Sequence, residues 1–211
     1  MKAALSFLSA YALLSVLLHG TAAAHVPYIE KRDYSFEQPF RVRGSVENSI
    51  AVYGWLESGN DTDVYRLEIP RPARLYCNAL VPVCPAYGQF LPWLAIAGPG
   101  LAAPDELLPF ALPQGYGAVV VKNIVPGEQR QQFYEPFGGK SYYTAPTFDQ
   151  TVSQTGTWYL YVWDPSGMGG DYVAVIGFKE RFSLLDILRA LINTPKIRLD
   201  RELHTDCRNA D

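Results

Sequence analysis

Short runs of alternating apolar and polar residues recur along the chain from residue 50 onward. Such alternation is typical of strands that bury one face. Turn-forming residues separate the runs, as in Ser58-Gly59-Asn60-Asp61 and Gly98-Pro99-Gly100. The pattern predicts strands over 50–56, 63–69, 74–83, 94–97, 117–121, 157–163 and 171–178. Many short strands with turns between them indicate an all-β, antiparallel, jelly-roll-like β-sandwich beginning near residue 45.

The alternation also predicts which side chains form the core. Residues of one parity along each strand should face the opposite sheet. The predicted core residues are Tyr65, Leu67, Leu94, Ile96, Trp158, Leu160, Val162, Tyr172, Ala174 and Ile176. Residues 101–150 differ, because they are rich in Pro and Gly and contain one firm strand, over 117–121. We therefore interpret 101–150 as a long insertion into the sandwich.

Near the C-terminus, the spacing of apolar residues changes from every second residue, typical of a strand, to the spacing typical of a helix. Ser183 is a favourable N-cap and Asp186 places negative charge in the first turn. Thr194-Pro195 is expected to end the helix, which would span about 184–193. A membrane-surface helix is the competing interpretation, and it is disfavoured because the polar face lacks a Lys/Arg cluster. The apolar stripe predicted to pack on the sandwich is Leu184, Ile187, Leu188, Leu191 and Ile192.

The N-terminus has the pattern of a secretory signal peptide. A positive start at Lys2 precedes an apolar run over 3–18, and Ala22-Ala23-Ala24 supplies small residues for cleavage. The predicted organisation is a signal peptide over 1–24, a sandwich domain over 25–180, and a helix with its tail over 181–211. No later run is long enough to span a bilayer, so we expect a secreted or periplasmic protein.

Composition narrows the class of partner. The 211-residue chain has a formal net charge of −3, with 18% charged and 13% aromatic residues. The sequence has no basic stripe to neutralise phosphates, which argues against nucleic acid as a partner. The aromatic content favours a packed β protein over a disordered chain.

Three cysteines follow the signal sequence: Cys77, Cys84 and Cys207. An oxidising compartment favours one disulfide and leaves one thiol. A bridge between Cys77 and Cys84 would need a bend, which Pro82 could supply. A bridge between Cys84 and Cys207 would instead hold the C-terminal tail, and we slightly favour it because a free tail would fray.

Three segments resemble a known family. Asp61-Thr62-Asp63-Val64-Tyr65 resembles the D-x-D-x-Y signature of bacterial pre-peptidase C-terminal domains. Gly156-Thr157-Trp158-Tyr159-Leu160-Tyr161-Val162 and Gly170-Asp171-Tyr172-Val173-Ala174-Val175 resemble their last two strands. Those domains are secreted jelly-roll-like sandwiches, usually accessory or binding modules beside hydrolases. The resemblance covers about 45–100 and 150–178, and it implies a fold more than a function.

An aromatic stripe follows one strand of the predicted sandwich. Tyr159, Tyr161 and Trp163 share one face of this strand, and Trp158, Leu160 and Val162 share the other. An exposed stripe would be a platform for a sugar or a peptide. The competing interpretation, which we favour, is that the 101–150 segment or the helix covers the stripe.

Two metal sites are conceivable from the residue types. Asp61 and Asp63, in a turn with Asn60, offer some of the oxygens that calcium needs, although turn capping and a hydrogen bond between Asp63 and a neighbouring loop explain them better. His25 would become the N-terminal residue after cleavage behind Ala24, and its amine and imidazole would chelate copper. His204 would be the second histidine of that copper site.

Catalytic motifs are sparse. No G-x-S-x-G is present, and the mature chain has histidines only at its two ends, His25 and His204. We therefore predict an exported, non-catalytic module that binds a protein or glycan partner or stabilises an envelope assembly. A copper-binding or copper-dependent redox protein is the first alternative, and a hydrolase is the second.

Overall fold

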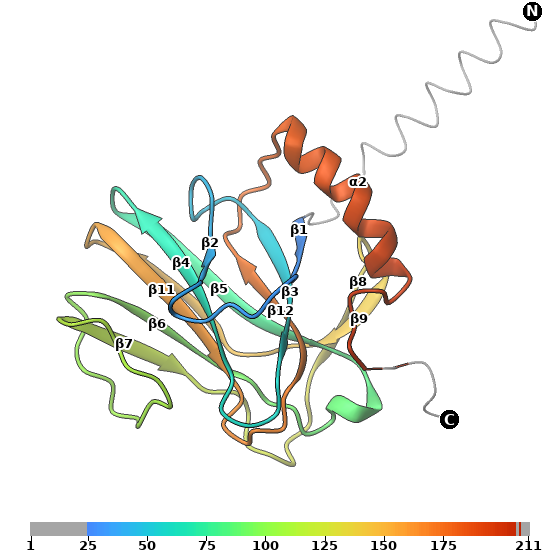
Figure 1. The fold of residues 1–211 in the computed structure, drawn as a ribbon, viewed down its shortest axis with the longest axis horizontal. Helices are drawn as coiled ribbons and strands as arrows, with labels where there is room; N and C mark the ends of the chain where they lie inside the picture. The colour runs from blue at the N-terminus through green and yellow to red at the C-terminus, as the bar shows by residue number, and fades with distance from the viewer. Residues whose placement is uncertain (1–24, 206, 208–211) are drawn as a thin grey trace, which may run out of the picture.

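Two β-sheets packed face to face form the body of the protein (Figure 1). The computed structural model describes residues 25–205 and Cys207, so the predicted signal peptide lies outside the described residues. The first sheet has the strand order β1 (Val26–Ile29), β3 (Ile50–Leu56), β12 (Gly170–Ile176), β5 (Ala73–Pro82), β9 (Lys140–Tyr143), β8 (Gln132–Glu135). A seventh strand of this sheet, β10 (Thr147–Val152), pairs with β5 outside that order. The second sheet has the order β2 (Phe40–Arg41), β4 (Thr62–Ile69), β11 (Gly156–Trp163), β6 (Trp93–Pro99), β7 (Tyr116–Val121). The predicted all-β sandwich is confirmed, with one C-terminal helix, α2 (Leu184–Arg198).

The core lies between the sheets, where the alternation placed it. All ten predicted core residues are at most 2% exposed. Trp158 and Tyr172 are among the largest of the fully buried side chains. The inward faces of β4, β6, β11 and β12 were therefore predicted correctly.

The sandwich begins earlier in the chain than the pattern predicted. β1 pairs parallel with β3, and β2 pairs parallel with β4, whereas the other strand pairs are antiparallel. These edge strands have four and two residues, which is too short for an alternation to be recognised. The first strand also contains Pro27, which is compatible with an edge position.

The segment 101–150 is more regular than expected. It contains all of β7, β8 and β9, and the first part of β10, where the sequence indicated one strand. β10 runs antiparallel to the first half of β5, from Thr147 beside Asn78 to Val152 beside Ala73. Its buried residues are Phe148 and Val152, four apart, with polar residues between them. That spacing does not distinguish a strand from a helix in the sequence.

Helix α2 begins where predicted and ends later. Ser183 and Asp186 form a reciprocal capping box, in which each side chain accepts a hydrogen bond from the backbone N–H of the other residue. The prediction that Pro195 ends the helix is wrong, because the helix continues to Arg198. Proline removes one helical hydrogen bond near the end of the helix. The turn that follows buries Ile197 completely, which offsets this loss.

The orientation of α2 is opposite to the prediction. Its polar side faces the body: Arg189 donates to the Tyr28 hydroxyl over 2.9 Å, and Asn193 donates to the Pro27 carbonyl over 2.9 Å. The stripe predicted to be buried is 47–81% exposed, and it consists of Leu184, Ile187, Leu188, Leu191 and Ile192. The helix therefore presents its apolar face to the outside.

A disulfide between Cys84 and Cys207 joins the residues before η1 (Pro85–Tyr87) to the C-terminal tail. Their Cα atoms are 5.1 Å apart. Cys77 is a buried free thiol, and burial raises its pKa far above the usual range. The favoured pairing is thus confirmed, and such a bond is typical of proteins that fold outside the reducing cytosol.

This arrangement predicts the thiol count of the protein. We expect about one reactive thiol per chain in denaturant without reductant and about three after reduction. In native buffer the Cys77 thiol should react slowly, because it is buried and protonated. Titration with a chromogenic disulfide reagent checks this count. A Cys77→Ala variant should lose the one thiol that is detected before reduction. Three reactive thiols before reduction would contradict the pairing.

Candidate binding site

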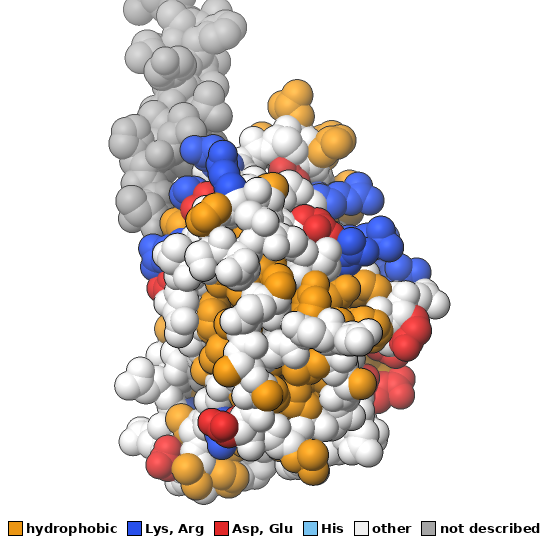
Figure 2. Space-filling model, turned by 90° about the vertical axis from the view of Figure 1, so that its left-hand side faces the viewer, with side chains coloured by type: hydrophobic (Ala, Val, Ile, Leu, Met, Phe, Trp, Pro, Cys, Tyr) orange, Lys and Arg blue, Asp and Glu red, His pale blue; other side chains and the backbone are white. Residues whose placement is uncertain are grey.

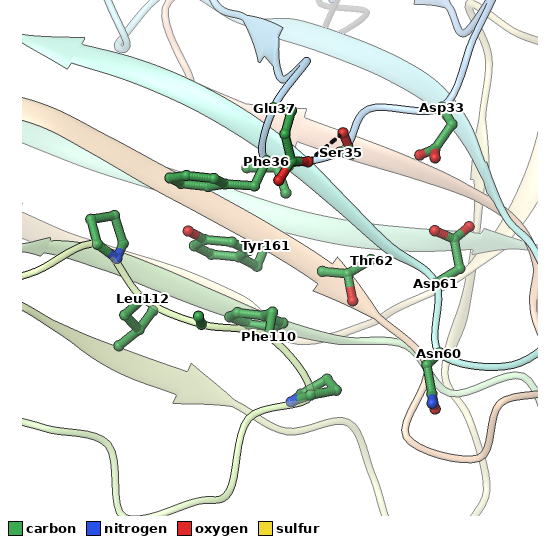
Figure 3. A pocket seen from close by; sticks show the side chains of 14 residues that line it. Asp33, Ser35, Phe36, Glu37, Asn60, Asp61, Thr62, Phe110, Leu112 and Tyr161 are labelled. Atoms are coloured by element: carbon green, nitrogen blue, oxygen red, sulfur yellow. Dashed lines mark hydrogen bonds between the residues drawn. The ribbon is translucent and has the colours of Figure 1, made fainter.

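A groove of about 420 Å³ lies at the outer side of the second sheet. Three segments far apart in the sequence form it: the β1–β2 connection, the β3–β4 turn with the start of β4, and the β6–β7 connection. Tyr161 of β11 lies at its floor (Figure 3). Because the loops of one sandwich edge converge there, this groove is the candidate site.

Aromatic rings make up the floor. The ring of Phe110 stacks on that of Tyr161, with centroids 4.2 Å apart and planes 5° apart. Phe36 extends over the neighbouring part of the strand and contacts Tyr159 at 5.4 Å between centroids. The groove thus offers a flat apolar surface on which a planar or aliphatic group can lie.

Carboxylates surround one end of the groove. The side chains of Asp33 and Asp61 point toward one another there, and Glu37 lies along the rim (Figure 3). Burial, and then the negative charges of Asp61 and Glu57, raise the pKa of Asp33 above its ordinary value. Among the described residues that line the groove, none is Lys or Arg. A positive charge brought to this end from outside would favour the ionised form of Asp33.

Two further acidic side chains, Asp63 and Glu30, lie behind the groove, in the interior. The Asp63 carboxylate, fully buried, accepts hydrogen bonds from the Tyr172 hydroxyl over 2.6 Å and from the Tyr34 N–H over 3.2 Å. The Tyr65 hydroxyl lies 2.5 Å from that of Tyr172. Burial raises the pKa of Asp63, and burial together with Asp63 raises the pKa of Glu30. The D-x-D-x-Y motif thus builds a polar network inside the core.

The aromatic stripe is covered rather than open. Tyr161 is fully buried and Trp163 is 5% exposed, because Phe110 of the 101–150 segment lies over both rings. Tyr159 is half-buried, between Phe36 and Tyr116. The structure does not bring these three residues together as an exposed platform, and only Tyr161 contributes to the groove.

The proposed calcium ligands do not converge. The Asp63 carboxylate is occupied by the hydrogen bonds of the core. One oxygen of Asp61 accepts a hydrogen bond from the Glu57 N–H over 2.6 Å, which closes the turn. Across residues 25–205 and Cys207, no three His, Cys, Asp or Glu side chains are placed to hold a metal ion.

His25 and His204 lie at opposite ends of β3. His25 hydrogen-bonds Ser49, just before that strand, whereas His204 stacks on Trp55, with ring centroids 4.6 Å apart. A strand rises about 3.3 Å per residue, so roughly 20 Å separates the two positions. The pair predicted for copper is therefore not brought together in this structure.

The contact between His25 and Ser49 is the nearest approach to a catalytic dyad. Burial lowers the pKa of His25, which favours the neutral imidazole that a general base needs. Ser49 is 2% exposed, however, and does not line the apolar hollows beside His25. A buried hydroxyl without access for a substrate holds the first strand in place rather than attacking a bond.

His204 belongs to a clamp on the C-terminal tail. Its ring nitrogen lies 2.8 Å from the buried carboxylate of Asp171, which also accepts a hydrogen bond from the His204 backbone N–H over 2.9 Å. Tyr87 donates its hydroxyl to the same carboxylate. Together with the disulfide at Cys207, these bonds hold the tail against β12.

Comparisons with known proteins indicate what the fold is similar to. No protein-family model and no curated protein sequence matches the chain. Its fold is similar to PliG of Aeromonas hydrophila, a periplasmic lysozyme inhibitor of g-type lysozyme (12% identity, 67% of this chain, 96% of that chain, TM-score 0.40). It is also similar to the pre-peptidase C-terminal domain of a Bacillus anthracis collagenase (15%, 71%, 100%, TM-score 0.36). A third similar structure is CorA, a surface-associated copper-binding protein of Methylomicrobium album BG8 (8%, 72%, 100%, TM-score 0.29).

The second of these proteins belongs to the family that the motifs resemble. At these TM-scores the similarity concerns the arrangement of strands, and the function of this chain rests on its own residues.

Sequence reasoning missed most of the groove. Asp33, Phe36 and Glu37 lie in a connection without periodicity, and Phe110 lies in the segment interpreted as an insertion. Asp61 was singled out for a different ligand. The available signal was a mixture of acidic and aromatic residues in one short segment, Asp33-Tyr34-Ser35-Phe36-Glu37.

Proposed function

We propose that the protein is an exported, non-catalytic binding module whose groove takes a cationic side chain of a partner protein. The observation that carries this proposal is the pair of facing carboxylates, Asp33 and Asp61, beside an aromatic floor without a lining Lys or Arg. A guanidinium or ammonium group placed between them would neutralise both. Its aliphatic stem would lie along Phe36 and Phe110.

The electrostatics support a cation rather than a neutral sugar. A raised pKa means that the neutral, protonated form of the carboxyl is favoured. A cation bound beside the carboxyl favours the ionised form instead and lowers this pKa. Part of the binding free energy thus comes from relief of repulsion among Asp33, Asp61 and Glu57. A glycan would gain nothing from this repulsion, and the aromatic stripe it would need is covered by Phe110.

Binding of N-acetyl-arginine amide tests the proposal. We expect this probe to shift the NMR signals of the Asp33, Asp61 and Phe110 amides. The neutral isostere N-acetyl-citrulline amide should leave them in place. An Asp33→Asn, Asp61→Asn double variant should bind the probe about tenfold more weakly, because a charged partner contributes more than a neutral one.

The pH dependence supplies an independent check. Because the ionised form of Asp33 binds the cation and its pKa is raised, affinity should rise with pH above the ordinary aspartate pKa of about 4 and level off once Asp33 is ionised. Asp33→Asn should flatten this rise. Asp105→Asn is the matched control, since Asp105 is exposed on the β6–β7 connection outside the groove. Equal affinity for the arginine and citrulline probes would refute the proposal.

A further inference from the structure

The outward face of α2 is a second surface, independent of the groove. Six apolar residues on it are 47–81% exposed, namely Leu184, Leu185, Ile187, Leu188, Leu191 and Ile192. With 3.6 residues per turn, these positions form a continuous arc of about 160° around the helix. Soluble proteins rarely leave so large an apolar patch uncovered unless something docks on it.

The opposite side of the helix fixes this orientation. The Arg189 guanidinium lies over the Tyr28 ring at 4.2 Å and also donates to its hydroxyl. Asn193 bonds the backbone of β1, and Ile197 is buried with Tyr53 and Val175 on the outer face of the first sheet. To turn its apolar face inward, the helix would have to break these contacts.

Positive charge flanks the apolar face. A groove of about 1010 Å³ runs between α2 and the β1–β2 segment, and seven of its lining residues are Lys or Arg. Four of them, Lys31, Arg32, Arg41 and Arg43, come from residues 26–43, which contain β1 and β2 and are called here the β1–β2 segment. The other three are Arg189 and Lys196 of α2, and Arg201. Among the described lining residues, none is Asp or Glu. Lys and Arg side chains gather mostly in the upper half of the face shown in Figure 2, at the level of α2 in Figure 1.

This concentration opposes the overall charge, which is −3 for the whole chain. Leu185, Leu188 and Ile192 line the same groove as the seven cations, so apolar and positive groups lie within one surface. An interfacial helix has this chemistry, with its apolar face in the acyl region and its cations at the headgroups. We infer that α2 and the β1–β2 segment dock the protein on an anionic phospholipid bilayer.

Charge complementarity selects the bilayer over a second copy of the chain. In a dimer formed through α2, two sets of seven cations would face one another across the interface. Anionic headgroups instead attract each of these cations by about 1 kcal/mol near the surface. The arrangement agrees, because an outward apolar arc with cations on one flank matches an acyl layer bordered by anionic headgroups.

The start of the described chain lies on the other flank of the helix. His25 lines an apolar hollow of about 650 Å³ together with Phe137, Phe182, Ile187 and Leu191. His25, the first described residue, therefore lies beside the apolar face of α2.

Vesicle sedimentation of the exported protein tests the inference. We expect binding to equimolar phosphatidylglycerol–phosphatidylcholine vesicles and at least tenfold weaker binding to pure phosphatidylcholine. Leu188→Gln with Leu191→Gln should weaken binding to the anionic vesicles about tenfold. Arg41→Gln with Arg43→Gln should weaken it by a similar factor and reduce its salt dependence.

Exposed control variants separate docking from folding. Leu107 is fully exposed on the β6–β7 connection, so Leu107→Gln should leave vesicle binding unchanged. All these variants change exposed side chains and should keep the wild-type circular dichroism spectrum. Equal binding to both vesicle types would overturn the inference. So would a dimer in size-exclusion chromatography that Leu188→Gln with Leu191→Gln dissociates, because it would show that a second copy covers the face.

Vesicle binding through α2 is independent of the acidic groove formed by Asp33 and Asp61. The Asp33→Asn, Asp61→Asn variant should bind vesicles like the wild type, and the α2 variants should bind the arginine probe like the wild type. Failure of one surface therefore leaves the test of the other intact.

Discussion

Asp171→Ala is expected to lower the free energy of unfolding by about 3 kcal/mol and to release the C-terminal tail. The carboxylate is 2% exposed and accepts hydrogen bonds from the backbone N–H groups of His204 and Thr205. It also pairs with the His204 ring and accepts the Tyr87 hydroxyl. Removing it leaves these donors without an acceptor, and the buried hydroxyl bears the largest part of the cost.

The measurement is thermal unfolding combined with limited proteolysis. A loss of about 3 kcal/mol corresponds to a melting temperature lower by about 9 °C for a chain of this size. Cleavage after Arg201 by trypsin should become faster, because the clamp around His204 no longer holds that segment. Asp171→Asn keeps one acceptor oxygen and should lose about half as much stability.

Asp149→Ala is the matched control. Asp149 forms a bidentate pair with Arg74 on the surface, and exposed pairs contribute at most about 1 kcal/mol. We expect no change in tail proteolysis for this variant. If Asp171→Ala unfolds like Asp149→Ala, then the disulfide and the Lys140–Glu202 ion pair hold the tail without help from Asp171.

The helix shows where the sequence was sufficient and where it was not. The capping box at Ser183 and Asp186 is local chemistry, and it was readable from two residues. The orientation of α2 could not be predicted from the sequence. A hydrophobic stripe indicates which face of a helix can be buried, but it does not indicate whether the surface that buries it belongs to the same chain. The deciding contacts come from Tyr28 and Pro27, more than 150 residues away.

The cations beside α2 illustrate the same limit. The membrane-surface interpretation was disfavoured because the helix itself lacks a Lys/Arg cluster. Lys31, Arg32, Arg41 and Arg43 reach the helix only through the pairing of β1 with β3 and of β2 with β4. Parallel edge pairings of two to four residues leave no recognisable period, so no sequence pattern could place these charges.

The strands of the sandwich and their buried faces were predicted more accurately than the helix orientation, because their alternation of apolar and polar residues is periodic. Tyr65, Trp158 and Tyr172 were expected in the core, and all are buried there. Asp63, the acidic partner of these tyrosines, was expected to bond a neighbouring loop rather than calcium, and it accepts the Tyr34 N–H of the β1–β2 connection. It is a hydrogen-bond acceptor in the interior, and that role depends on a hydroxyl of β12 about a hundred residues later.

The β1–β2 segment connects the two proposed surfaces. Asp33 and Glu37 face the groove, whereas Lys31 and Arg32 face α2. Adjacent residues of one short segment therefore supply opposite charges to two sides of the molecule. A protein held on lipid by α2 would keep the acidic groove on a different face from the membrane-directed cations, free to meet a partner.

Gly98→Ala is expected to destabilise the protein by about 3 kcal/mol, because the new methyl group has no room. A Cβ atom at Gly98 would lie 2.2 Å from Cε3 of Trp158, well inside the contact distance of two carbons. The indole cannot move aside freely, since it is 2% exposed and its Nε1–H donates to the Gln154 carbonyl over 3.1 Å. Gly98 is also paired with Gly117 of the edge strand β7, and β6 lies between β7 and β11, which restricts backbone movement.

Thermal unfolding and tryptophan fluorescence of four variants, Gly98→Ala, Trp158→Leu, their combination and Gly88→Ala, decide whether this clash is the cause. Gly88→Ala is the control: its backbone is helical, with φ of −56°, and its Cβ would lie 3.7 Å from the nearest atom, so its stability should change by less than about 0.5 kcal/mol. In Gly98→Ala with Trp158→Leu, the smaller side chain makes space for the methyl group. The two losses should therefore be less than additive by about 1–2 kcal/mol. Strict additivity would mean that Gly98 is required for its backbone freedom and not for the space that Trp158 occupies.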